Sequence, residues 1–171
     1  PEKYGRLLFR LVEHFKPDTI IELGTALGIS TLYMAKANPR AKVFTVEGCT
    51  TRSEQAVNNF NLLKARNIIL HIGRFDIILP DMTEQAGKLD FAFIDGHHTR
   101  KATLSNFRKL LKISHNDTVF VFDDIHWSKD MENAWQEISG HEQVTVSIDL
   151  FRMGIVFLRK ELSRQKFVIR F

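Results

Sequence analysis

Short apolar runs alternate with helical stretches along most of the chain, and this alternation limits the fold more than any other feature of the sequence. The runs with strand character are TIIEL, KVFTVE, NIILHI, LDFAFID and TVFVFDD, at 19–23, 42–47, 67–72, 89–95 and 118–124. Apolar residues at helical spacing predict helices around them, over 4–15, 29–37, 51–65, 76–87, 99–112 and 128–139. Strands that alternate with helices of this length predict an α/β fold, in which helices cover both faces of a parallel sheet.

The last two apolar runs break this alternation. QVTVSIDL (143–150) and MGIVFLRK (153–160) follow one another with no helix between them. Because the link is too short for a parallel crossover, the two runs should pair antiparallel. The sequence therefore predicts a doubly wound, mostly parallel sheet of about seven strands that ends in an antiparallel hairpin.

Length and composition restrict the class of protein. The chain has 171 residues, 44% hydrophobic and 26% charged, which fits one globular domain over 1–171. No apolar run reaches the roughly 18–20 residues of a membrane span. Cys49 is the single cysteine, which favours a reducing, cytoplasmic setting. The chain opens with Pro1 rather than Met, so we expect that an amino-terminal segment is missing.

Acidic residues stand at the ends of four predicted strands: Glu22, Glu47, Asp95, and the pair Asp123 and Asp124. The carboxyl ends of parallel strands meet at one edge of a sheet, where ligands of such folds bind. Each acid alone could be a helix cap or a solvated strand end. Crowded carboxylates need compensating cations or donors, so together they predict a ligand with positive charge, hydroxyl donors, or both.

The first strand leads into the glycine turn ELGTALGIS, 22–30. Gly24 and Gly28 permit a tight turn, but their G-x-x-x-G spacing differs from the G-x-G-x-x-G of dinucleotide sites. Glu22 beside the turn argues against a pyrophosphate, which disfavours a nicotinamide dehydrogenase. Glu47 ends the second strand, where an acid can hold ribose hydroxyls. A ligand with ribose, a positive charge and no phosphate fits this pattern, and S-adenosyl-L-methionine is such a ligand.

With these motifs the chain, from about residue 4 to 160, resembles the class I S-adenosylmethionine-dependent methyltransferases. It is similar in particular to the catechol and caffeoyl-CoA O-methyltransferases and their bacterial relatives. The resemblance rests on ELGTALGIS, VFTVEG, HIGRFDIILPDM, FIDGHH and VFDDIHW. It implies a Rossmann-like sheet in the order 3-2-1-4-5-7-6, with the last strand antiparallel, and methyl transfer to a hydroxyl-bearing small molecule.

The resemblance also implies a set of cofactor-binding residues. Glu47 would hold the ribose hydroxyls, and Arg74 and Phe75 would lie near adenine, although Phe75 could equally be ordinary core. Glu22 would act indirectly by fixing the glycine turn. The methionine portion and its turn would involve the remaining residues, Gly24, Thr25, Gly28 and Ser30.

Asp95, Asp123 and Asp124 match the metal-binding positions of the family, which usually has Asp-Asn where this chain has Asp-Asp. Oxygen ligands suit Mg²⁺ or Ca²⁺. The alternative is a metal-free site in which Asp95 serves the cofactor and the other two aspartates bond to loops.

The catalytic base is the second departure from the family. His98 stands where metal-dependent members often carry lysine, three positions after Asp95, and histidine can accept a proton near neutral pH. Capping or simple exposure would also explain the His97–His98 pair. His97, His126 and Trp127 are the candidates for an acceptor pocket.

Other functions remain open at this stage. An RNA methyltransferase would use the same cofactor, and the basic segment at 159–170 could contact phosphate, although we read this segment first as a solvated tail. The net charge of +4 permits an anionic partner without requiring one, and a small molecule is favoured over nucleic acid or a membrane. A non-catalytic cofactor-binding domain and a homodimer are also compatible with the sequence.

Overall fold

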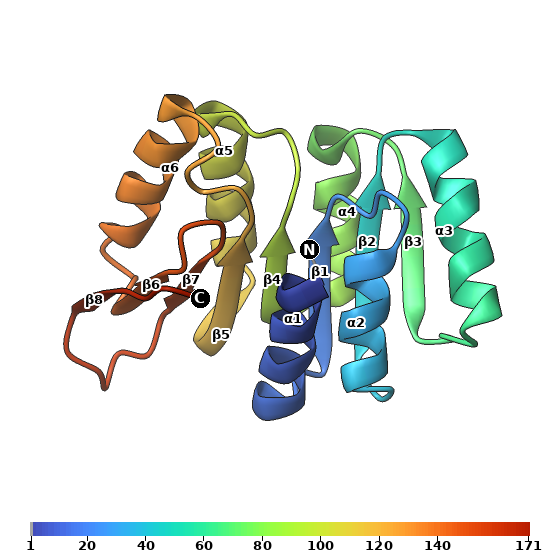
Figure 1. Cartoon of the computed structure of the whole chain (residues 1–171), viewed down its shortest axis with the longest axis horizontal. Helices are drawn as coiled ribbons and strands as arrows, with labels where there is room; N and C mark the ends of the chain where they lie inside the picture. The colour runs from blue at the N-terminus through green and yellow to red at the C-terminus, as the bar shows by residue number, and fades with distance from the viewer. Residues whose placement is uncertain (1) are drawn as a thin grey trace. The chain divides into compact units, whose positions relative to one another are not determined.

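The computed structural model describes residues 2–171, which form two compact units (Figure 1). The first unit ends at Gly87, and the second runs from Lys88 to Phe171. The prediction that residues 1–171 form one domain stays a prediction.

Three parallel strands form the sheet of the first unit, in the order β3-β2-β1: β1 (Thr19–Leu23), β2 (Lys42–Glu47) and β3 (Ile68–Ile72). The register pairs Glu22 of β1 with Thr45 of β2. β1 is buried from Ile20 onward, as expected of a strand covered on both faces.

Residues 2–87, the part of the first unit that the structure describes, contain four helices: α1 (Glu2–Phe15), α2 (Ile29–Ala37), α3 (Thr50–Leu62) and α4 (Phe75–Ala86). Helix α1 buries Tyr4, Leu8 and Val12, one residue per turn on a single face. α1 and α2 lie on one face of the strands and α4 lies on the other (Figure 1).

The second unit orders its strands β4-β5-β7-β6-β8: β4 (Leu89–Ile94), β5 (Ser114–Phe122), β6 (Val146–Asp149), β7 (Gly154–Phe157) and β8 (Gln165–Val168). β4 and β5 are parallel, whereas β7 is antiparallel to both β5 and β6. The predicted terminal hairpin is therefore present. Since β7 runs against β5, the beginning of β7 lies beside the end of β5, where Phe122 pairs with Gly154.

Aromatic side chains make the core of the second unit, between these strands and the helices α5 (Arg100–Leu111) and α6 (Lys129–Ser139). Phe107 of α5 contacts Phe120 and Phe122 edge-on, with ring centroids 5.1 and 5.7 Å apart. Both helices begin at a capping side chain: Thr99 accepts a hydrogen bond from the Ala102 N–H, and Ser128 accepts one from the Met131 N–H. These caps end the loops that carry the site residues.

The structure differs from the sequence prediction mainly near the carboxyl terminus. β8 is an additional strand, paired in parallel with β6, in the segment that the sequence suggested was a tail. All four of its residues are exposed, so no apolar alternation marked it. β5 also begins at Ser114 rather than 118, because the polar residues before Thr118 continue the strand after an irregular register with β4. None of the helices in residues 2–171 is long and apolar enough to cross a membrane.

Candidate functional site

The glycine turn of the first unit joins β1 to α2 in a left-handed backbone conformation at three positions. Gly24, Ala26 and Gly28 have φ values of 107°, 47° and 77°. At Gly28 a Cβ atom would lie 2.3 Å from a ring carbon of Phe60, so packing as well as backbone geometry requires glycine there. Ala26 is the strained member, because a left-handed conformation costs an L-residue about 1–2 kcal/mol. In this conformation the backbone N–H of Ala26 points toward the carboxylate of Glu47.

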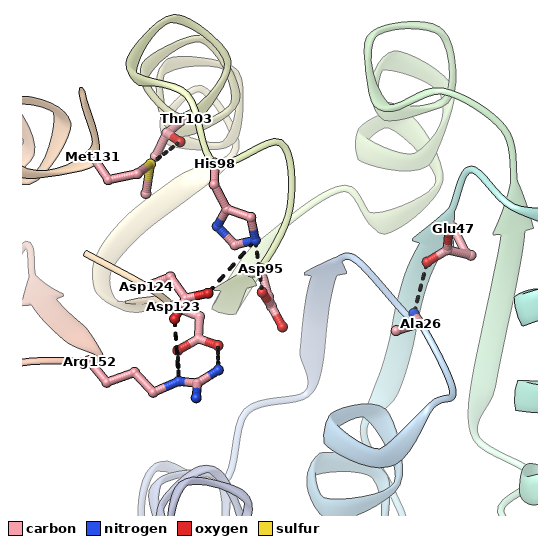
Figure 2. Close-up of polar contacts among 9 residues, drawn as sticks. All are labelled: Ala26, Glu47, Asp95, His98, Thr103, Asp123, Asp124, Met131 and Arg152. Atoms are coloured by element: carbon pink, nitrogen blue, oxygen red, sulfur yellow. Dashed lines mark hydrogen bonds and ion pairs between the residues drawn. The ribbon is translucent and has the colours of Figure 1, made fainter. Parts of the chain in front are cut away.

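Glu47, the last residue of β2, receives that N–H. Its Oε2 accepts a hydrogen bond of 2.8 Å from Ala26 N (Figure 2). Its Oε1 accepts one of 3.0 Å from Cys49 N. Each carboxylate oxygen has two acceptor positions, so each can accept one further hydrogen bond. The side chain is 8% exposed, and two backbone donors fix its orientation. A ribose diol offers two hydroxyl donors, which this carboxylate can accept.

Glu22 has a different environment, because it is fully buried. Ser30 donates its hydroxyl to Oε1 at 2.5 Å, while Thr45 at 2.6 Å and Thr31 donate to Oε2. Burial raises the pKa of Glu22, the three hydroxyl donors lower it in part, and the charge of Glu47 raises it further. The oxygens of Glu22 thus bond to side chains of β2 and α2, on both sides of the glycine turn, and its predicted indirect role in cofactor binding stays a prediction.

Several of the other residues predicted to contact the cofactor already have hydrogen-bond partners within the protein. Ser30 bonds to Glu22, and the hydroxyl of Thr25 lies 2.6 Å from that of Thr45. Arg74 is an exposed residue that pairs in bidentate fashion with Asp76, and Phe75 is only 7% exposed. Their predicted contacts with the methionine and adenine portions stay predictions, and burial favours the core role for Phe75.

The second unit brings the other acids together at the ends of β4 and β5. Asp123 N donates to Ile94 O at 3.0 Å, which places Asp123 beside the residue before Asp95. His98 lies between two carboxylates, with Nε2 3.7 Å from Asp95 Oδ1 and 3.9 Å from Asp124 Oδ2 (Figure 2). Three carboxylates and one imidazole therefore form an acid cluster: Asp95, His98, Asp123 and Asp124.

Arg152, which no motif in the sequence indicated, places a cation beside the acid cluster. Its Nε and Nη2 each donate to one oxygen of Asp123 at 3.1 Å, and Nε lies 3.4 Å from Asp124 Oδ1 (Figure 2). These hydrogen bonds raise the pKa of the Arg152 guanidinium. Burial and the charge of Asp123 raise the pKa of Asp124, while Arg152 and His98 lower it.

The position of Arg152 beside the acids follows from the predicted order of strands. In the order 4-5-7-6 with β7 antiparallel, the residues before β7 must lie beside those after β5. Arg152 precedes β7 by two residues, and Ile125 N donates to its carbonyl oxygen at 3.1 Å. The sequence predicts a positively charged ligand beside the acids, whereas the hairpin of the chain itself supplies a cation there.

The predicted metal ligands fit the structure only in part. Each oxygen of Asp123 accepts a hydrogen bond from Arg152, so the face of this carboxylate that an ion in the oxygen-only set of Asp95, Asp123 and Asp124 would share already holds a cation. Within residues 2–171, the group that could hold an ion is Asp95, His98 and Asp124, with one ligand atom from each within 4.8 Å of the others. Mixed nitrogen and oxygen ligands do not select Mg²⁺ or Ca²⁺. The arrangement therefore does not support a mechanism that depends on Mg²⁺ or Ca²⁺.

The three residues predicted for the acceptor pocket occupy the loops after β4 and β5. His97 has a left-handed backbone, with φ 55°. His126 is held by Asp149, with Nε2 2.8 Å from Oδ2, and stacks on Phe151 at 5.5 Å between ring centroids. Trp127 is 72% exposed, so it is not a core residue.

Phe151 and Asp149, from the β6–β7 hairpin, also lie against His126. No motif in the sequence indicated either residue as part of the site. The Phe151 ring is 76% exposed. Asp149 also accepts a hydrogen bond from Trp135 Nε1 at 3.1 Å, so its carboxylate joins the hairpin to α6 and to the loop that carries His126.

Comparison with known proteins adds a family relationship. The sequence pattern of a family described as "Methyltransferase domain" matches residues 21–125, which contain the glycine turn and every predicted site residue except His126 and Trp127.

Two curated proteins are similar in sequence. One is named a probable O-methyltransferase, from Mycobacterium tuberculosis, and is 30% identical over 142 residues, which are 72% of this chain and 56% of that protein. The other is a catechol O-methyltransferase from Niastella koreensis, 29% identical over 124 residues, or 71% and 55% of the two chains. The chain thus spans just over half the length of these curated relatives.

A solved structure shows the same fold. The O-methyltransferase from Bacillus cereus, described in complex with SAH, has a TM-score of 0.79 and 20% identity. The similarity covers 92% of this chain and 81% of that one. This likeness confirms the fold class that the sequence predicted.

Proposed function

The chain belongs to the class I methyltransferase family, and from this premise we propose that it transfers a methyl group from S-adenosyl-L-methionine to the hydroxyl of a small molecule. The observation that carries the proposal is Glu47, whose two oxygens are oriented by backbone N–H groups and can each accept one more donor. That arrangement suits a ribose diol, which offers two hydroxyl donors.

The first unit would hold the cofactor. Glu47 accepts the ribose hydroxyls, and the left-handed turn from Gly24 to Gly28 lets the backbone approach the methionine portion closely. Glu22 keeps the turn in place through Ser30 and Thr31. Gly24, Thr25, Arg74 and Phe75 remain the other proposed cofactor contacts in this unit.

The second unit would handle the acceptor. S-adenosylmethionine would supply an electrophilic methyl group: as the acceptor oxygen bonds to the methyl carbon, the bond from that carbon to the sulfonium sulfur would break and S-adenosylhomocysteine would leave. His98 accepts the proton of the acceptor hydroxyl at a ring nitrogen, and Asp95 and Asp124 orient the ring from 3.7 and 3.9 Å. The gain in rate comes mainly from alignment of donor and acceptor. His97, His126 and Trp127 would contact the acceptor.

Cofactor binding can be tested by calorimetric titration with S-adenosylmethionine, S-adenosylhomocysteine and NAD. We expect the first two to bind and NAD not to bind. Glu47→Gln should weaken binding roughly 10- to 100-fold, because it removes a charge-assisted hydrogen bond. Glu54→Gln, an exposed change on α3, is the matched control. Unchanged affinity in Glu47→Gln, with the fold intact, would contradict the assignment.

Methyl transfer itself requires a panel of hydroxyl-bearing acceptors and detection of the methylated product by mass spectrometry. His98→Ala should lower kcat by about 10²- to 10⁴-fold if His98 is the base. A chain that binds S-adenosylmethionine but methylates none of the panel would support the non-catalytic cofactor-binding alternative.

An RNA acceptor is the second candidate, favoured by the basic carboxyl-terminal segment. Arg164, Lys166 and Arg170 are exposed on or beside β8. RNA binding would weaken steeply as salt rises, with a slope set by the number of phosphates contacted. A titration of a short RNA at two salt concentrations distinguishes this acceptor from a small molecule, for which we expect little salt dependence.

A further inference from the structure

The acid cluster carries more negative charge than its site can hold without compensation. Asp95, Asp123 and Asp124 stand on two adjacent strand ends, and the Asp123 side chain is only 5% exposed. Carboxylates this close disfavour one another's ionised forms unless a cation lies among them. The structure itself contains such a cation, the guanidinium of Arg152.

The contact between Arg152 and Asp123 has the geometry of a strong, specific ion pair. Two N–H groups meet two oxygens at 3.1 Å each, and Nε also lies 3.4 Å from Asp124. A guanidinium matches a carboxylate in this bidentate form and stays charged at any physiological pH. A divalent ion would have to displace it to take an oxygen of Asp123 in the same direction.

The backbone places Arg152 at this point. Phe151 has a left-handed φ of 70°, its N–H donates to Asp149 Oδ1 at 2.8 Å, and Arg152 N donates to Leu150 O at 2.9 Å. On the other side, Ile125 N donates to Arg152 O at 3.1 Å. The backbone of Arg152 is therefore hydrogen-bonded both to the hairpin and to the loop after β5. These bonds fix the position from which its side chain reaches Asp123.

We propose that Arg152 is the built-in counter-cation of the acid cluster and takes the place of a divalent metal, so that this chain transfers methyl groups without one. Arg152 acts as a positioning residue: its guanidinium holds the carboxylates of Asp123 and Asp124 in the orientation in which Asp124 faces His98. The kinetic part of this inference rests on the proposed function, whereas the part on metal binding stands on its own.

The test is titration of the whole chain with Mn²⁺, followed by calorimetry and by loss of the free-ion EPR signal. We expect weak or no binding to the wild type. Arg152→Met should bind Mn²⁺ at least roughly tenfold more tightly, because Asp123 becomes free to act as a ligand. Arg152→Lys should stay close to the wild type, since it keeps the charge.

Arg159→Met is the matched control. Arg159 is as exposed as Arg152, at 38% of its side chain, and pairs with a single aspartate, Asp117, at 3.4 Å. It should leave Mn²⁺ affinity unchanged. Micromolar Mn²⁺ binding to the wild type, or no gain in folded Arg152→Met, overturns the proposal. If Arg152→Met does not fold, the wild type and Arg152→Lys still decide it, since tight binding by either contradicts the inference.

Activity gives a second measurement. Wild-type turnover should be unaffected by EDTA, and Arg152→Lys should retain more turnover than Arg152→Met. Titration with S-adenosylmethionine in parallel separates the two proposals. A wild type that binds neither the cofactor nor Mn²⁺ contradicts the proposed function alone, whereas one that binds both tightly contradicts the role of Arg152 alone.

Discussion

Glu22 and Asp123 are both buried acids at strand ends, one in each unit, yet the protein compensates their charges in different ways. Glu22 receives hydrogen bonds from the hydroxyl groups of Ser30, Thr31 and Thr45, and none of these three partners is a cation. Asp123 has a bidentate ion pair with Arg152. Hydroxyl groups can donate or accept, so the Glu22 network tolerates a neutral acid, whereas a guanidinium only donates and requires an anion. Glu22 therefore serves mainly to connect hydrogen-bonded segments, whereas Asp123 serves mainly as the negative partner of an ion pair.

The largest expected effect is that of Glu22→Ala. It leaves three hydroxyls without their acceptor in a buried site and creates a cavity, so we expect a loss of about 3–5 kcal/mol in the free energy of unfolding. Urea unfolding measures it. Glu13→Ala, an exposed change on α1, should stay within about 0.5 kcal/mol. A loss below about 1 kcal/mol for Glu22→Ala would mean that the hydroxyls find other partners.

Arg152→Met should have the next largest effect. It leaves Asp123 buried without its cation, and we expect a loss of about 2–3 kcal/mol, below the range for fully buried pairs because Arg152 is partly exposed. Arg159→Met should cost less than about 1 kcal/mol, since its pair with Asp117 is more exposed. Equal losses in the two variants would make Arg152 an ordinary surface arginine.

Asp123→Asn tests the same ion pair from its other side. The amide keeps the shape of the carboxylate but removes the charge and one acceptor, and Arg152 can still reach solvent. We expect a loss of about 1–2 kcal/mol at pH 7. Thermal unfolding at low and high salt measures it, and a variant as stable as the wild type would remove the distinction between Asp123 and Glu22.

Glu22→Gln should have the smallest effect, and its sign depends on pH. The folded-state pKa of Glu22 is raised above its ordinary value of 4.5, so the folded chain binds more protons than the unfolded chain between those two pKa values. Wild-type stability therefore falls as pH rises through that window and is least affected below it. The Glu22→Gln variant has no titrating group at this position, so its stability lacks this dependence on pH.

The stability of Glu22→Gln relative to the wild type should thus increase with pH through the window and then level off. We expect the variant to be within about 1 kcal/mol of the wild type at pH 5, or slightly more stable above it. Unfolding curves from pH 4 to 8 measure the difference. A difference that shrinks as pH rises would show that hydrogen bonds, and not burial, dominate the environment of Glu22.

The sequence predicted the elements of the fold well because each rests on a local pattern. The strand TIIEL and the turn with Gly24 and Gly28 could be identified from apolar runs and glycine spacing alone. β8 could not, because its exposed residues gain no core contacts and its hydrogen bonds to β6 depend on where the hairpin ends. Local patterns reveal an element only when burial selects the residues within it.

The sequence alone determined which acids stand at the strand ends, since strand period and length place Glu22, Glu47, Asp95 and Asp123 there. Only the tertiary structure decided what each acid does. The partners of Glu22 are hydroxyls up to 23 residues away, and the partner of Asp123 is an arginine 29 residues away in an antiparallel hairpin. A carboxylate's charge is balanced by whichever groups lie within a few ångströms, and that neighbourhood is set by pairing between distant segments.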